Sequence, residues 1–165
     1  IRAIADLIKS GYNLRLKIVG GIIQNHHQKY LEYLKKLASE LKIDKAVEFS
    51  GAVSYGKMPE YLGSAKILIN AVPFGGLDKV TLEAMSCGVV PLTSNNAFLS
   101  IFPKEIADDL VFKEGNLEDL KFKLKNVLDK NIYTDEEIGN QLCEIIVKNH
   151  NLDNLIEKIT EEMKK

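Results

Sequence analysis

The sequence lacks an excess of charge of either sign. Its 22 Lys and Arg residues nearly balance 23 Asp and Glu residues, which gives a formal net charge of −1. This balance gives no electrostatic reason to expect nucleic acid or an anionic membrane as the main partner, because both attract strongly basic surfaces. The sequence also has no apolar run near the roughly 20 residues that a transmembrane helix needs. We therefore expect no nucleic-acid partner, and membrane contact only through parts of the protein outside this chain.

Cysteine is scarce, and neither cysteine has metal-ligand spacing. Cys87 and Cys143 lie far apart among apolar neighbours, so we expect small core residues in a reducing, cytoplasmic protein. His26 and His27 have no carboxylate or cysteine at ligand spacing. We expect both histidines to be solvated, and we expect no metal site.

The motifs of several enzyme classes are missing. There is no Gly-x-x-x-x-Gly-Lys-Ser/Thr run, which disfavours a P-loop ATPase, and Gly20-Gly21 alone does not form a Gly-x-Gly-x-x-Gly dinucleotide motif. No Gly-x-Ser-x-Gly elbow exists, which argues against a serine hydrolase of that type. The acidic cluster and flavin-phosphate loop expected of a response-regulator or flavodoxin-type module are not evident either.

What the chain does have is a regular alternation of strand-like and helix-like segments with short connections. Apolar periodicity predicts strands over 14–19, 45–51, 66–72, 89–94 and 109–113. It predicts helices over 1–10, 27–43, 55–65, 79–87, 117–130, 135–149 and 152–164. This order predicts an α/β fold, with a Rossmann-like parallel sheet and helices on both faces. We expect one domain over residues 1–165, with C-terminal helices over 131–165, and we interpret the chain as a piece of a longer protein.

Three loops should lie at the carboxyl ends of the predicted strands, where open α/β sheets bind ligands. They are Gly20–Gln24, Gly51–Lys57 and Val72–Lys79. All three contain glycine, which lets backbone N–H groups come close to a ligand. The Gly20-Gly21 pair is equally compatible with a simple turn between strand and helix.

The third loop leads into a helix that carries unusual charges. Asp78 is a plausible N-cap, and Lys79 in the first turn opposes the helix dipole. Lys79 is either solvated or helps to bind an anion at the helix N-terminus. Glu83 lies one turn further on among apolar residues. It is either a structural residue stabilised near the N-terminus or a ligand for two vicinal hydroxyls, as a ribose presents.

Taken together, these segments resemble a known family. The strings "LRLKIVGG", "VEFSGAVSYGKMPEYLGSAKILINAVPFGG" and "KVTLEAMSCGVVPLTS" occur in the order and spacing of the C-terminal, donor-binding domain of retaining GT-B glycosyltransferases, in the group called family 4 or glycosyl transferases group 1. The resemblance covers roughly residues 1–130, and "LEAMSCG" is its most specific part. It implies a UDP-, GDP- or ADP-sugar as donor and a glycan or lipid-linked acceptor. It also implies retaining sugar transfer in polysaccharide biosynthesis, without a metal cofactor.

The resemblance also implies roles for individual residues. Glu83 matches the second glutamate of the family's Glu-(seven residues)-Glu motif, which binds the ribose of the donor. The backbone from Gly76 through Leu77, Asp78 and Lys79 to Val80 matches the segment that holds the sugar and the diphosphate. Gly51, Ala52 and Val53 match the loop beside the base, and Gly20 and Gly21 line the phosphate side of the cleft.

The sequence departs from this family at two places. Gly75 occupies the position of the first motif glutamate, which contacts the transferred sugar, so no residue is assigned with certainty to catalysis. The Arg and Lys that bind the diphosphate in the family, the first strand and the N-terminal acceptor domain all precede the segment that begins at Ile1. The alternative is therefore a degenerate, non-catalytic nucleotide-sugar-binding or scaffold domain.

Overall fold

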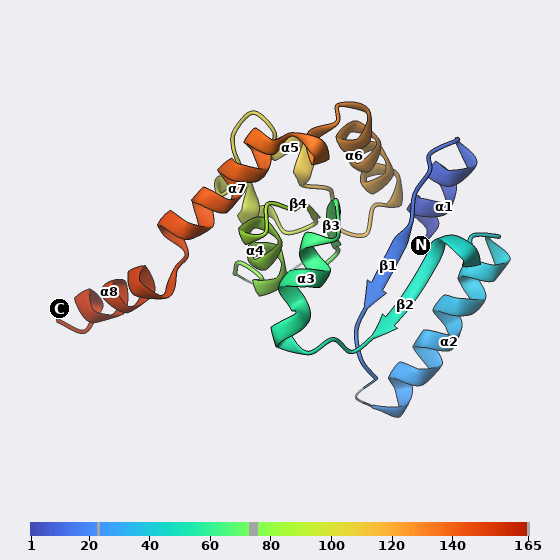
Figure 1. Ribbon diagram of the computed structural model, residues 1–165, viewed down its shortest axis with the longest axis horizontal. Coiled ribbons are helices and arrows are strands. Elements are labelled where there is room, and N and C mark those ends of the chain that lie inside the picture. Colours follow the sequence, from blue (N-terminus) through green and yellow to red (C-terminus); the bar gives the residue numbers. More distant parts are fainter. Residues whose placement is uncertain (23, 73–75, 165) are drawn as a thin grey trace. The chain divides into compact units, whose positions relative to one another are not determined.

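The computed structural model describes residues 1–22, 24–72 and 76–164, and the chain forms two compact units (Figure 1). The first unit comprises Ile1–Met58 and Leu117–Phe122, and the second comprises Pro59–Asn116 and Lys123–Lys165. Each unit contains one pair of parallel strands. The predicted α/β class with parallel strands flanked by helices is confirmed.

The first unit is a strand–helix–strand arrangement. It contains α1 (Arg2–Lys9), β1 (Leu16–Val19), α2 (Asn25–Glu40), a short 3₁₀ helix (Asp44–Ala46) and β2 (Val47–Gly51). The two strands pair in parallel, starting with Leu16 opposite Val47, and α2 forms the crossover between them (Figure 1). Ala5, Ala38 and Ile43 form a buried apolar cluster that joins the two helices.

The second unit contains the other parallel pair and most of the helices. Its elements are α3 (Met58–Gly63), β3 (Ile67–Asn70), α4 (Lys79–Ser86), β4 (Val90–Thr93), α5 (Ala107–Leu110), the C-terminal half of α6 (Leu117–Asp129), α7 (Glu136–Asn149) and α8 (Leu152–Glu162). Shorter 3₁₀ helices follow β4 (Asn96–Ser100) and precede α7 (Ile132–Thr134), and another before α3 (Tyr55–Lys57) belongs to the first unit. Ile67 pairs with Val90 and Asn70 pairs with Thr93, so both strands end at the same edge.

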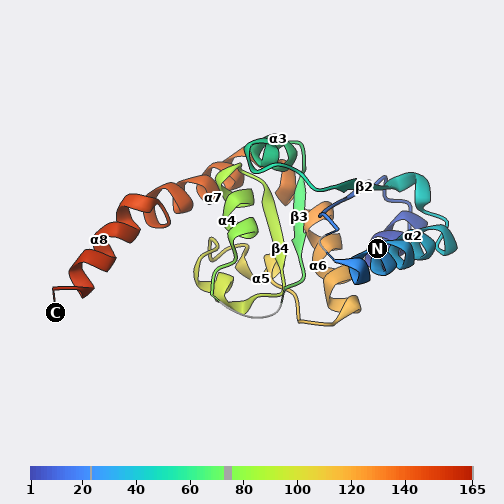
Figure 2. The same ribbon diagram turned by 90° about the horizontal axis from the view of Figure 1, so that it is seen from below.

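Strand β4 lies in the core of the second unit. All four of its residues are buried, including Pro91. Helices α4 and α7 lie side by side next to the β3–β4 pair (Figure 2). Met85 of α4 and Leu142 of α7 are fully buried there. Apolar burial of this kind is the main stabilising contribution to such a unit.

The predicted strand over 109–113 is wrong. A helical turn starts after Pro103, whose carbonyl accepts from the N–H of Ala107, and α5 continues to Leu110. Only Val111 pairs with β4, through a single parallel bridge to Thr93. The apolar side chains of this segment are buried as predicted, but Leu110 is placed by a helix and not by a strand.

Neither the two cysteines nor the apolar side chains of the last helix are fully buried. Cys87 and Cys143, predicted as small core residues, are free thiols that are only half-buried. Helix α8 leaves its apolar side chains exposed: Leu152, Leu155, Ile156, Ile159 and Met163. Within the described ranges, no helix is long and apolar enough to cross a bilayer.

Candidate functional site

The candidate site of the second unit lies at the carboxyl ends of β3 and β4. Asn70 is the last residue of β3, and it pairs with Thr93, the last residue of β4. The N–H of Ser94 donates to the carbonyl of Asn70 at 3.1 Å, which continues the pairing one step beyond the strands. This is the edge at which open parallel sheets bind ligands.

Asp78 caps the N-terminus of α4, as predicted. Its Oδ1 accepts from the backbone N–H of Thr81 at 2.9 Å and from Nδ2 of Asn70 at 2.7 Å. The same Asn70 nitrogen lies 3.1 Å from Oγ1 of Thr81. The start of α4 is therefore bonded directly to the end of β3, which fixes the position of the helix N-terminus relative to the sheet.

The N-terminus of α4 has the features of an anion-binding end. The first N–H groups of a helix have no carbonyl partner within the helix, and the helix dipole is positive there. A Cβ atom added to Gly76, two residues before the cap, would meet no atom within 4 Å. Lys79 extends into solvent, with 72% of its side chain exposed. A phosphate could approach this end and meet both the dipole and a cation.

Glu83 lies one turn into α4 and is half-buried, with 25% of its side chain exposed. Its Oε1 lies 3.5 Å from Nζ of Lys79. That contact is an ion pair and not a hydrogen bond, because Oε1 is buried and has no hydrogen-bond partner among the described residues. The carboxylate of Glu83 therefore has unused capacity to accept from a ligand hydroxyl.

Three buried side-chain oxygens within the described ranges have no hydrogen-bond partner. They are Oδ2 of Asp78, Oε1 of Glu83 and Oγ of Ser94. Buried polar atoms in folded proteins are nearly always paired with protein or with ordered water. Asp78 is the N-cap of α4, Glu83 lies one turn into α4 and Ser94 follows β4, so all three belong to the second unit. Ordered water or a polar ligand would satisfy each of these oxygens.

The glycine loops of the first unit come together as the sequence predicts. The N–H of Gly20 donates to the carbonyl of Gly51 at 2.9 Å. A Cβ atom at Gly21 would lie only 2.9 Å from Cβ of Ala52, so a side chain there would collide. Gly51 has φ of +71°, a conformation that glycine adopts without strain. Val53, two residues after Gly51, is half-buried.

Gly75 lies outside the described residues, so its assignment to the position of the family's first motif glutamate stays a prediction. Leu77 is half-buried and Val80 is exposed at the N-terminal end of α4. The expected solvation of His27 is only partly met, because its Nδ1 accepts from the N–H of Gln24 at the start of α2. The side chain of His26 lies outside what the structure describes.

Sequence reasoning missed the residues that build the support of this site. Asn70, Ser94 and Asn95 are all buried, and the side-chain Nδ2 of Asn95 donates to the carbonyl of Gly76 at 3.0 Å. A signal was present, because each follows or ends an apolar strand at the ligand-binding edge. Polar residues at such positions are typical of site residues in parallel sheets.

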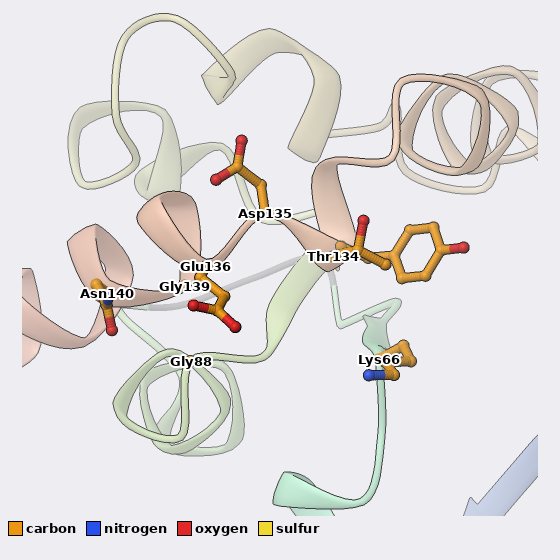
Figure 3. A pocket seen from close by; sticks show the side chains of 8 residues that line it. Lys66, Gly88, Thr134, Asp135, Glu136, Gly139 and Asn140 are labelled. Carbon is orange, nitrogen blue, oxygen red and sulfur yellow. The ribbon is translucent and has the colours of Figure 1, made fainter.

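A polar cavity of about 340 Å³ lies at the opposite, amino end of the β3–β4 pair. Lys66 directly before β3 and Gly88 shortly before β4 contribute to its wall. Figure 3 shows Glu136 and Asn140 of α7 on its other wall. No sequence motif indicated a site at this end of the strands. No group of three or more potential metal ligands is present in the described part of the chain.

A parallel α/β unit with a capped, open helix N-terminus at the carboxyl edge of its strands defines a Rossmann-like ligand-binding domain. Residues 1–144 match the sequence profile of the family "Glycosyl transferases group 1". The chain belongs to this family, and its solved structural relatives are GT-B glycosyltransferases.

A curated relative matches part of the chain. It is the GDP-Man:Man(3)GlcNAc(2)-PP-Dol alpha-1,2-mannosyltransferase of Dictyostelium discoideum, which is 29% identical over 85 residues. The match spans 52% of this chain but only 17% of that relative.

Solved structures resemble nearly the whole chain. HepE of Anabaena in complex with UDP has a TM-score of 0.82 at 14% identity, over 99% of this chain and 44% of that one. Sucrose-phosphate synthase of Thermosynechococcus elongatus has a TM-score of 0.77 at 16% identity, over 98% of this chain and 41% of that one. At such identities the likeness shows the fold alone. The chain spans less than half the length of both structures.

Proposed function

We propose that this chain is the donor-binding part of a retaining glycosyltransferase. It binds a nucleoside diphosphate sugar and takes part in transfer of the sugar to a hydroxyl of a glycan or lipid-linked acceptor, in polysaccharide biosynthesis. Membership of the glycosyl transferases group 1 family supports the reaction class. The observation that carries the proposal is the α4 N-terminus, where Gly76 is open, Lys79 is cationic and Glu83 keeps a buried carboxylate oxygen without a hydrogen bond among the described residues.

The chemistry of the donor requires these features. In the reaction the bond between the anomeric carbon and the diphosphate oxygen breaks, and a new bond forms to the acceptor oxygen while the acceptor proton is lost. Negative charge develops on the departing diphosphate. The dipole of α4 and the ammonium group of Lys79 would stabilise that charge without a metal cofactor.

Each predicted residue has a role in this proposal. Glu83 accepts hydrogen bonds from the ribose hydroxyls, and the backbone from Gly76 to Val80 holds the sugar and the diphosphate. Gly51, Ala52 and Val53 lie beside the base, and Gly20 and Gly21 give the diphosphate close access to the backbone. The acceptor is bound by an N-terminal domain outside this chain, on the cytoplasmic side, with any membrane contact made by such outside parts.

Binding of nucleotide sugars by the full-length protein tests the proposal. Calorimetry should include GDP-mannose, since the curated relative is named as a GDP-mannose enzyme, and UDP-glucose, since HepE was solved with UDP and glucose. ADP-glucose completes the set of bases. We expect one of these donors to bind and to be hydrolysed or transferred when an acceptor is present. Failure of all three to bind would contradict the proposal.

Gly75 favours a second candidate function, a nucleotide-sugar-binding protein that does not transfer sugar. A glycine replaces the motif glutamate that contacts the transferred sugar in the family. This candidate predicts that the protein binds a nucleotide sugar but releases no nucleoside diphosphate in the presence of acceptors. It also predicts that Gly75→Glu does not weaken binding. Sugar transfer by the unmodified protein would exclude it.

A further inference from the structure

Two buried asparagines hold the loop that leads into α4. Asn70 ends β3 and is 7% exposed, and Asn95 lies two residues after β4 and is 4% exposed. A buried amide needs partners for both its oxygen and its nitrogen. Asn70 finds partners for both atoms in this loop, and Asn95 finds one there and one in its own turn, so both residues support the loop.

Asn70 bonds both ends of this loop. Its Oδ1 accepts from the backbone N–H of Val72 at 3.2 Å, at the start of the loop. Its Nδ2 donates to Oδ1 of Asp78 at 2.7 Å, at the end of the loop. One side chain therefore fixes where the loop leaves the sheet and where α4 begins.

Asn95 holds the loop from the other strand. Its Oδ1 accepts from the N–H of Ala97 at 3.0 Å, and its own N–H donates to Oγ1 of Thr93 at 3.1 Å. These bonds set the orientation of the side chain. Its Nδ2 then reaches across to the carbonyl of Gly76 at 3.0 Å, 19 residues earlier in the chain.

The hydrogen bond from Asn95 to Gly76 also determines where the N–H of Leu77 points. The carbonyl of Gly76 and the N–H of Leu77 belong to one planar trans peptide and point in opposite directions. Because the carbonyl faces Asn95, the N–H of Leu77 is directed away from it. Gly76 is exposed, and nothing lies within 4 Å of the position that its Cβ would take, so a ligand can approach this residue.

We propose that Asn95 is a positioning residue that orients the Gly76–Leu77 peptide so that its N–H group binds the diphosphate of the donor. Asn70 holds the cap of α4 in the matching position. The inference rests on the proposed function. The inference goes beyond the proposed function because it assigns the orientation of the diphosphate-binding peptide to a side chain that does not touch the ligand.

Asparagine is the residue that this arrangement requires. Asn95→Asp would place a carboxylate oxygen against the carbonyl of Gly76 and repel it. Asn95→Ser would still accept from the N–H of Ala97, as serine does in local turns, but its hydroxyl is too short to reach Gly76. The serine variant thus loses the hydrogen bond to Gly76 while keeping the local turn. Asn96→Asp is the matched control, because Asn96 is the exposed next residue and undergoes the same charge change.

The test measures binding of UDP, GDP and ADP, and of the matching monophosphates, to the full-length protein and its variants by calorimetry. Asn95→Ser and Asn95→Asp should weaken binding of the diphosphate at least fivefold and that of the monophosphate less than twofold. Asn96→Asp should change neither, and thermal unfolding checks that each variant is folded. Equal binding by Asn95→Ser and the parent, or equal loss for both nucleotides, would overturn the inference. No nucleotide binding by the parent would instead refute the proposed function itself.

Discussion

Replacing Glu83 by glutamine should separate binding from stability. The side chain keeps its size but loses its charge, so the ion pair to Lys79 at 3.5 Å disappears. Ion pairs at i and i+4 of a helix are worth only about 0.3–0.5 kcal/mol. Oε1 is buried and has no hydrogen bond to any described residue, so removing the charge also removes part of the cost of burying it. The two effects oppose each other, and we expect the free energy of unfolding to change by less than about 1 kcal/mol.

The effect on nucleotide binding should be much larger. A carboxylate that accepts from a ribose hydroxyl contributes about 1.5–3 kcal/mol. Its loss corresponds to roughly a 10- to 150-fold increase in Kd. Glutamine keeps one acceptor oxygen, so we expect Glu83→Gln near the lower end of that range and Glu83→Ala above it.

The assay combines calorimetry with the nucleotide that binds the parent and urea denaturation of both proteins. Glu105→Gln is the matched control, because Glu105 is exposed in the same unit and lies outside the candidate site. It should alter neither quantity. If Glu83→Gln lowers the free energy of unfolding by more than about 1.5 kcal/mol and leaves Kd unchanged, Glu83 is a structural residue and the reasoning is refuted.

Two further predictions concern close backbone contacts. A Cβ atom at Gly139 would lie 3.1 Å from the carbonyl oxygen of Gly88, so Gly139→Ala should push α7 away from α4 and lower the free energy of unfolding by about 1–3 kcal/mol in urea denaturation; an unchanged midpoint would contradict this packing. Gly21→Ala should be destabilising too, since its Cβ would lie 2.9 Å from that of Ala52. Gly20→Ala has open space around the added carbon and should stay within about 0.5 kcal/mol of the parent, so equal effects of the two changes would argue against the loop contact.

Helix positions were predictable where local chemistry decides them. Asp78 precedes a short apolar run and has an oxygen that can accept from the N–H three residues later, and it caps α4 as expected. The segment around Leu110 was not predictable in this way. Its apolar residues suit a strand or a buried helix equally, and the bond to Pro103 that starts the helical turn is a local choice that periodicity does not report.

Some residues of the candidate site were also predictable from the sequence, and others were not. Gly51 and Gly76 were found from the sequence because glycine marks loops where the backbone must be accessible or unusually bent. Asn70 and Asn95 were missed because their importance comes from contacts with residues 8 and 19 positions away. Such contacts depend on the pairing of β3 with β4, which a single sequence does not specify.

Glu83 was recognised from the sequence as an anomaly, but its meaning depends on its surroundings. A carboxylate among apolar residues can be neutralised by a nearby cation or can await a ligand. The structure gives it Lys79 at ion-pair distance and still leaves Oε1 without a hydrogen bond among the described residues. The choice between a structural role and a ligand role thus became testable only with the atomic positions.

The most direct test of the central claim is to locate nucleotide binding on the chain by NMR. Backbone amide signals of the isotope-labelled protein would be followed while UDP, GDP and ADP are added in turn. With the nucleotide that binds, the account predicts shifts at Gly76, Leu77 and Val80, and none at Gly139 beside the cavity at the opposite end of the strands. The account would be contradicted if no nucleotide shifted these signals, or if the shifts gathered around Gly139 instead.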